Sequence, residues 1–398
     1  MVEVSVDRNE LVPFRLEFVG NAGDVVRDSR GSWLMVQLHG IHRGVFSNFK
    51  RKRLSMKRIF LPTLLGVLLC PLFLYSQLEE LPQRTGLFDY TLSFQGDTVP
   101  YLLSSTGRDF TPRKLVLFIQ GSMPEPLFTI EEEGGPWRFA CPVPYRKYMN
   151  EYFFCILPKP GIPIVAKADE LTANGLYMNP QTGEFLTYYQ ERNYLEYYVD
   201  RADAVLRELT SKLEFDEIVL IGGSEGARVA ASLAHKNEFI THLIYYSTEP
   251  LGRFYGYIFK ERQAVLRGEK TEEEASEQIA AQFKKWEEIN KAPLSTAAKT
   301  GDTNRAWTSF SVSCVEEILA LDIPVIIAHG TADPGIQNID YLRLEAIRRQ
   351  KDNITFRAYH QHNHWLNKLT YDEEGKVVSS DYVFDEIYAS WLEWVANH

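Results

Sequence analysis

Cysteine is scarce in this chain of 398 residues, which contains four, and no two of them form a C-x-x-C pair. So few cysteines exclude a small fold held by disulfides and a zinc site built on cysteine pairs. Positive charge is also limited, because 43 Lys and Arg face 53 Asp and Glu, a formal net charge of −10. Nucleic-acid binding requires a basic surface that displaces counterions from phosphates, so we expect no nucleic-acid partner. An apolar content of 45% excludes a disordered chain and indicates an acidic globular protein.

Only one long apolar run is present, at residues 59–76 (IFLPTLLGVLLCPLFLYS), directly after Met56-Lys57-Arg58. A charged start, an apolar stretch and a small residue at its end are typical of a secretory signal peptide. We therefore expect residues 56–76 to be a signal that is cleaved near Ser76, with export to the periplasm or the exterior and no stable membrane partner afterwards. The alternative is that residues 59–76 remain as a membrane anchor. Because a signal peptide begins a chain, residues 1–55 are interpreted as a non-native upstream extension or a disordered tail.

From residue 77 onward, short apolar runs alternate with helical patterns, which predicts an α/β domain with a mostly parallel sheet flanked by helices. The predicted helices cover 190–213 and 384–395. Residues 251–320 contain no convincing strand and are rich in helix-forming residues, so we expect a helical cap there. The predicted strands are a hairpin at 88–104, with Gly96-Asp97 in its turn, and runs at 114–120, 152–157, 217–222, 240–246, 324–328 and 354–359.

Two cysteines of this domain have alternative interpretations. In an oxidising compartment Cys141 and Cys155 could form a disulfide. The other possibility is that Cys155, which lies in an apolar strand pattern, is a buried thiol.

A serine between glycines follows one of the buried runs. Residues 222–226 read Gly-Gly-Ser-Glu-Gly, directly after EIVLIG and before the helical stretch ARVAASLA. Glycines on both sides permit a sharp turn from strand to helix, which exposes the Ser224 hydroxyl at the end of the strand. The start of the following helix directs backbone N–H groups to the same place.

With this motif the sequence, over roughly residues 86–397, resembles the α/β-hydrolase superfamily, in particular its serine esterases and peptidases with a helical cap. The resemblance implies that Ser224 is the nucleophile, followed by an acid and then a histidine. Asp333, in the loop after the run PVIIA, matches the acid. His364, which precedes Trp365, matches the base, while His360 and His362 in the same segment remain alternatives. Such a histidine accepts the serine proton and later returns it to the leaving group, and the aspartate holds its tautomer.

The resemblance also implies two backbone N–H donors that stabilise the oxyanion of the tetrahedral intermediate. One belongs to Glu225, and the other to Ser122 or Met123, in a loop where the family commonly has His-Gly and this chain has Gln120-Gly121. The Glu225 side chain is expected to interact with the helix dipole, or else to attract a cationic group such as an amine.

Other residues could contact the substrate. Candidates are Gln120, Lys159, which could bind an anionic group or be a solvated residue of the rim, and Trp365. Trp286 and Trp307 of the predicted cap could line an acyl or aryl pocket, or serve packing alone.

The sequence therefore predicts a carboxylesterase that acts on a small molecule or a peptide through an acyl-enzyme, without cofactor or metal. A serine exopeptidase is the alternative, because Gly-Gly-Ser-x-Gly with an acidic cap resembles the prolyl aminopeptidase branch. Two remote alternatives are a hydrolytic metal site at H-x-H-x-H (360–364) and a binding protein without activity. The oligomeric state is left open.

Overall fold

The computed structural model describes residues 25–27, 33–35, 79–104, 113–132, 134–334 and 338–398, and it divides into two units at residue 64. In the first unit β1 (Val25–Arg27) pairs antiparallel with β2 (Trp33–Met35). The predicted signal segment 56–76 lies outside the described residues. Within the described part of the chain, no helix is long and apolar enough to cross a membrane.

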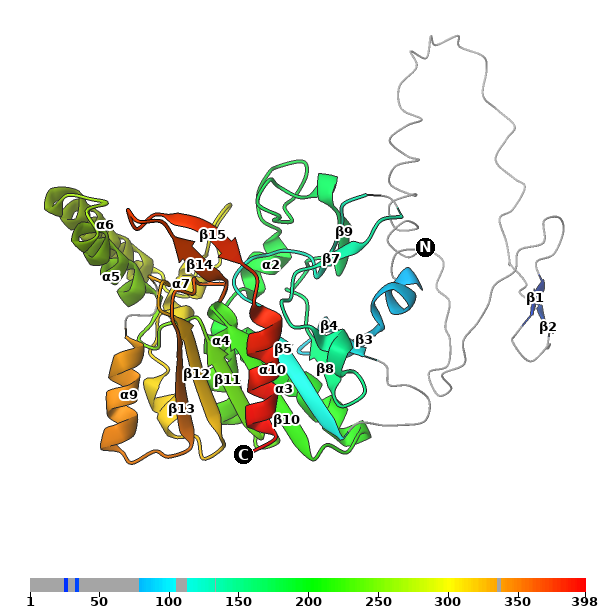
Figure 1. The fold of residues 1–398 in the computed structure, drawn as a ribbon. Helices are drawn as coiled ribbons and strands as arrows, with labels where there is room; N and C mark the ends of the chain where they lie inside the picture. The colour runs from blue at the N-terminus through cyan, green and yellow to red at the C-terminus, as the bar shows by residue number, and fades with distance from the viewer. Residues whose placement is uncertain (1–24, 28–32, 36–78, 105–112, 133, 335–337) are drawn as a thin grey trace, which may run out of the picture. The chain divides into compact units, whose positions relative to one another are not determined.

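The second unit is built on an eight-stranded sheet with the order β13-β12-β11-β10-β5-β8-β4-β3 (Figure 1). All neighbours from β13 to β8 are parallel, and β4 and β3 add an antiparallel edge. This is the sheet of an α/β-hydrolase fold, so the predicted fold class is confirmed. The strands are β3 (Leu87–Phe94), β4 (Asp97–Ser104), β5 (Lys114–Ile119), β8 (Phe153–Ile156), β10 (Glu217–Gly223), β11 (His242–Tyr246), β12 (Val325–Gly330) and β13 (Ile354–Tyr359).

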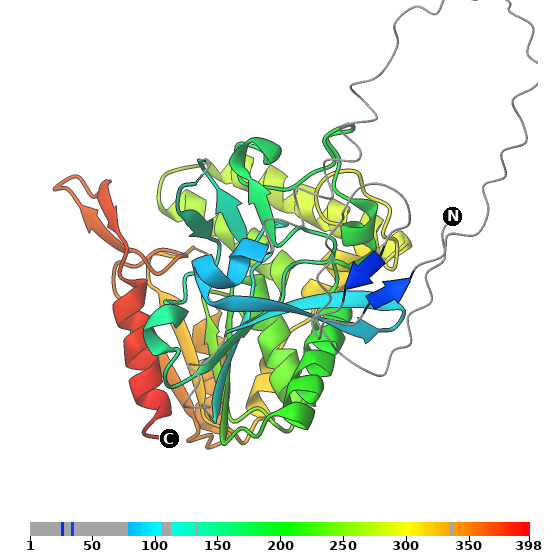
Figure 2. The same ribbon diagram turned by 90° about the vertical axis from the view of Figure 1, so that its right-hand side faces the viewer.

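Alternate residues of the central strands fill two cores, one on each face of the sheet, because successive side chains of a strand point to opposite faces. In β10, Leu220 belongs to one core and Ile221 to the other. The first core is covered by α3 (Leu195–Lys212) and α4 (Glu225–Lys236), and the second by α10 (Phe384–Val395). Figure 2 shows α10 on one side of the sheet and the two green helices, α3 and α4, on the other.

The range expected to be a cap contains four helices and, among the described residues, no strand. They are α5 (Arg253–Leu266), α6 (Glu272–Lys291), α7 (Asn304–Phe310) and α8 (Val315–Leu319). At the start of α6 the Thr271 side chain accepts a hydrogen bond from the Glu274 backbone N–H, and the Glu274 carboxylate accepts one from the Thr271 backbone N–H. This capping box explains where the long acidic run becomes helical.

Several short elements were not predicted. Five of them are strands that form two small sheets apart from the main one: β6 (Phe128–Ile130), β7 (Trp137–Phe139) and β9 (Val165–Lys167) in the first, and the hairpin β14 (Lys368–Tyr371) and β15 (Val377–Asp381) in the second. The remaining elements are α2 (Thr187–Arg192), α9 (Ile339–Arg348) and the 3₁₀ helices Tyr145–Tyr148 and Ala168–Glu170.

Two predicted boundaries are wrong. The helix expected at 190–213 is two helices, because the backbone of Tyr194 is extended and separates α2 from α3. The turn of the first hairpin is Gln95-Gly96, where both φ angles are positive (49° and 85°), as a two-residue turn of this kind requires. Asp97 is therefore the first residue of β4, where its carboxylate binds Arg192 at 2.6 Å.

The disulfide between Cys141 and Cys155 is not present, since both residues are buried free thiols. Their side chains belong to different cores, Cys155 to the one beneath α3 and α4 and Cys141 to the one beneath α10. The sheet lies between them, so they cannot pair without disrupting it.

Candidate active site

Ser224 lies on a strained turn between β10 and α4, with φ 54° and ψ −130°. Its backbone N–H donates to the Tyr246 carbonyl on the neighbouring strand at 3.1 Å, which fixes the turn. The flanking glycines leave no room for a side chain. A Cβ on Gly222 would lie 2.3 Å from the Gly226 carbonyl oxygen, and one on Gly226 would lie 2.3 Å from the Ile119 carbonyl oxygen. The motif is therefore needed for the close approach of β5, β10 and α4 as well as for the conformation of the serine.

The mutation Gly226→Ala is expected to lower the free energy of unfolding by about 2–3 kcal/mol, because a methyl group would meet backbone rather than a movable side chain. Urea denaturation would measure this change. Gly121→Ala is a matched control, since its Cβ would have its nearest contact at 3.8 Å. Equal effects of the two mutations would contradict the argument.

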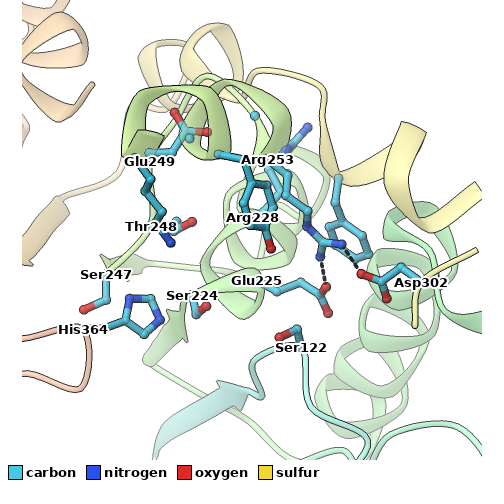
Figure 3. Close-up of a pocket in the computed structure, with 15 residues that line it drawn as sticks. Ser122, Ser224, Glu225, Arg228, Ser247, Thr248, Glu249, Arg253, Asp302 and His364 are labelled. Atoms are coloured by element: carbon cyan, nitrogen blue, oxygen red, sulfur yellow. Dashed lines mark hydrogen bonds and ion pairs between the residues drawn. The ribbon is translucent and has the colours of Figure 1, made fainter. Parts of the chain in front are cut away.

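Asp333 and His364 follow the ends of β12 and β13, which are neighbouring parallel strands. His364 Nδ1 lies 2.7 Å from Asp333 Oδ2. Asp333 is 2% exposed, whereas His364 is partly exposed and lines the same cavity as Ser224 (Figure 3). A histidine held through Nδ1 by a carboxylate presents Nε2 to the cavity.

The two loops that bear these residues are also joined through their backbones. The Ala332 N–H donates to the His362 carbonyl at 2.9 Å, and the Thr331 N–H donates to the Tyr359 carbonyl at 3.0 Å. A Cβ on Gly330 would lie 2.2 Å from the His362 carbonyl oxygen, so glycine permits this contact.

The two alternative histidines have other surroundings. His360 is exposed, and its carbonyl oxygen lies 2.7 Å from Nδ1 of His362. Within the described ranges, no group of three His, Cys, Asp or Glu side chains is placed to hold a metal ion. The three-histidine metal hypothesis therefore receives no support from the geometry.

The loop after β5 passes the serine, because Gly121 lies close enough that its Cβ would be 3.8 Å from that of Ser224. Ser122 lines the cavity, whereas Met123 is exposed and does not. Gln120 is buried and does not line the cavity. Of the two predicted loop donors, Ser122 is thus the one placed beside the serine.

Glu225 is the first residue of α4, and both of its carboxylate oxygens are paired. Oε1 lies 3.0 Å from Lys159 Nζ, and Oε2 contacts the Arg253 guanidinium. Burial alone would raise the pKa of Glu225, but Lys159 and Arg253 hold it below its ordinary value. Asp302 completes the network at 2.5 Å from Arg253 (Figure 3).

Lys159 is therefore not a rim residue that could meet an anionic substrate. It is 3% exposed, and its ammonium lies 4.3 Å from the centre of the Tyr198 ring. Burial lowers its pKa, and the Glu225 carboxylate opposes that shift. The role of Lys159 is to balance the charge of Glu225 beneath the site.

The cap tryptophans do not line the cavity. Trp286 and Trp307 pack around Phe254, with ring centres 4.6 Å and 4.9 Å from its own. Trp365 is 67% exposed and does not line the cavity either, although its ring lies edge-on to His364.

The cavity at the serine has a volume of about 190 Å³, and many of the side chains that line it are charged. Sequence reasoning missed Ser247 and Glu249, in the segment after β11, and Arg253 and Asp302, in the cap. Ser247 and Glu249 could have been found from the sequence, because they directly follow β11. The carboxyl ends of parallel strands meet at one edge of a sheet, and β11 lies beside β10, which leads to Ser224. The lining residues are Ser122, Ser224, Glu225, Arg228, Ser247, Thr248, Glu249, Gly252, Arg253, Gly256, Tyr257, Lys260, Asp302, Phe310 and His364.

The strand order and the serine turn define an α/β-hydrolase fold. No protein-family model and no curated protein matches the chain in sequence. Among solved structures, it is similar to Pyrococcus horikoshii acylaminoacyl peptidase, with 11% identity, a TM-score of 0.44, and coverage of 70% of this chain and 37% of the peptidase. It is also similar to a Mycobacterium tuberculosis puromycin-hydrolyzing peptidase, with 11% identity and a TM-score of 0.42. The similarity covers 70% of this chain and 36% of that peptidase. Est1E from Butyrivibrio proteoclasticus gives 11% identity and 0.42, covering 78% and 98%. This chain thus spans little more than a third of either peptidase.

Proposed function

We propose that this protein is a serine hydrolase that cleaves carboxylic esters through an acyl-enzyme. The observation that carries the proposal is the Asp333–His364 hydrogen bond beside the cavity that Ser224 also lines. A strained serine, a carboxylate-held imidazole and backbone N–H groups at a helix start are the components that acyl transfer requires.

In this mechanism His364 Nε2 takes the Ser224 proton as Oγ attacks the ester carbonyl carbon. The oxyanion accepts hydrogen bonds from backbone N–H groups, that of Glu225 and one in the loop at Ser122. The carbon–oxygen bond to the alcohol then breaks, and His364 returns the proton to the departing alkoxide. A water molecule, deprotonated by the same nitrogen, hydrolyses the acyl-enzyme to the free acid.

The first step requires a hydrogen bond from Ser224 Oγ to His364 Nε2. The described residues include no hydrogen bond between Ser224 and the His364 ring. Catalytic hydrogen bonds often tighten only in the substrate complex, so we expect this one to form when the ester binds.

The ester is proposed to have a short acyl group, because the cavity of about 190 Å³ is below the volume of most ligand pockets and is lined by charged side chains. Hydrolysis of an aminoacyl amide is the second candidate, and Glu249 in the cavity favours it, because its Oε1 has no hydrogen-bond partner among the described residues. Anilides and phenyl esters of the same acids would decide between the two.

Labelling with a fluorophosphonate tests the proposal. We expect one phosphonylated peptide, which mass spectrometry would locate at Ser224, and no labelling of Ser224→Ala. A protein that is folded by circular dichroism and remains unlabelled would contradict the proposed function. The hydrolase activity is proposed for residues 77–398. We also propose that the segment 56–76 directs export, and the N-terminal sequence of the secreted protein would test this.

A further inference from the structure

Three consecutive residues after β11 line the cavity and have no part in the proposed mechanism. Ser247, Thr248 and Glu249 follow one another along one side of the site, away from Asp302 (Figure 3). Ser247 is 1% exposed and Glu249 is 9% exposed, so these polar groups are largely withdrawn from solvent.

Glu249 is held by one of its two oxygens. Oε2 accepts hydrogen bonds from the Leu251 backbone N–H at 2.9 Å and from Asn338 Nδ2 at 3.2 Å. Oε1 is buried and has no hydrogen-bond partner among the described residues, and the same is true of Ser247 Oγ. A buried acceptor without a donor is unfavourable, and a ligand that supplies the donor removes this cost.

The two arginines that line the cavity already have partners of opposite charge. Arg253 binds Glu225 and Asp302. Arg228 lies 2.6 Å from Glu317.

Glu249 has no such partner within the described residues. Lys260 also lines the cavity, but it is exposed and its ammonium lies over the Tyr257 ring. Burial without a counterion raises the pKa of Glu249 to about 7. A cation from the substrate would supply the missing charge.

We infer that Glu249 Oε1 is the acceptor for an ammonium group of the substrate, which makes the substrates esters or amides of amino acids or short peptides with a free amine. The inference rests on the proposed function and deepens it. An ammonium group matches the site better than a hydroxyl group because it supplies both the donor that Glu249 Oε1 lacks and a positive charge beside that carboxylate.

The test compares isosteric substrates with and without the amine. Phenyl esters of alanine and of 2-methylpropanoic acid differ only in an ammonium for a methyl group, as do those of glycyl-alanine and propanoyl-alanine. The two pairs place the amine at two distances from the carbonyl. We expect the wild-type protein to prefer the amine in at least one pair by about 10- to 100-fold in kcat/KM.

In Glu249→Gln this preference is expected to fall to within about threefold. Glu261→Gln is the matched control, since that carboxylate binds Lys270 and does not line the cavity. We expect it to keep the wild-type preference. The inference is overturned if the wild-type protein shows no preference in either pair, or if Glu249→Gln keeps the preference.

A binding measurement separates this inference from the proposed function. Calorimetric titration with n-butylammonium chloride should show saturable binding to the wild-type protein that Glu249→Gln lacks and that 1-pentanol does not reproduce. If Ser224 is not labelled by the fluorophosphonate and no ester is cleaved, the proposed function fails. The titration still tests the ammonium site, because it does not depend on hydrolysis. Equal binding of n-butylammonium to both proteins, or none to either, overturns the inference.

Discussion

Replacing His364 with alanine is expected to lower kcat/KM by about 10⁵-fold, whereas replacing His362 should change it by less than about tenfold. Of these two histidines, His364 is the one that combines a carboxylate partner, at 2.7 Å through Nδ1, with a place in the wall of the cavity. Its loss removes the acceptor for the serine proton, and the backbone donors and substrate contacts alone retain little of the rate.

The measurement is steady-state hydrolysis of a phenyl ester by both variants, with thermal unfolding as a check on the fold. His364 is partly exposed, so its replacement should leave the unfolding midpoint close to that of the wild-type protein. A larger loss in His362→Ala than in His364→Ala would move the base to His362 and refute the assigned pair.

Lys159→Met is expected to give the largest loss of stability, about 3–4 kcal/mol in the free energy of unfolding. Lys159 and Glu225 form an ion pair whose side chains are 4% and 3% exposed. Removing one member of such a pair leaves a buried charge that water cannot reach. Arg253 still binds Glu225, so the expected loss is toward the lower end of the range for buried pairs.

Chemical denaturation would measure this loss, with Lys147→Met as the control. Lys147 also binds a carboxylate, Asp385 at 2.5 Å, but its side chain is mostly exposed and the pair should contribute little. Adding Glu225→Gln to Lys159→Met should recover part of the stability, since it removes the buried carboxylate oxygen that Lys159 no longer pairs. Equal effects of the two lysine replacements would contradict the expected contribution of the buried pair.

The central sheet could be predicted because its strands are buried on both faces and read as continuous apolar runs. The run EIVLIG became β10, with all residues from Ile218 to Gly223 buried. The small hairpin of β14 and β15 could not be predicted in this way. Val377 and Val378 at the start of β15 are both exposed, so this strand has no continuous apolar run and no buried alternate positions.

The positions of Ser224, Asp333 and His364 follow from the sequence because each comes after a recognisable strand. The charges around them do not, because their pairing depends on segments that are far apart in the chain. Lys159 and Glu225 are separated by 66 residues, and Arg253 and Asp302 by 49. The sequence shows that these charges exist, but only the packing of the cap against α4 shows which of them are neutralised and that Glu249 is not.

The backbone contact between the loops at Gly330 and His362 has a consequence for engineering. Main-chain hydrogen bonds join the two loops, and the Thr331 side chain adds one more by accepting from the Gln361 N–H at 2.9 Å, so each loop fixes the position of the other. A transplant of this acid and base into another scaffold should therefore carry both loops together. Library design should keep the start of β14, where the Leu369 N–H donates to the Gln361 carbonyl at 2.6 Å, and can instead randomise Val377 and Val378 of β15, whose side chains are exposed.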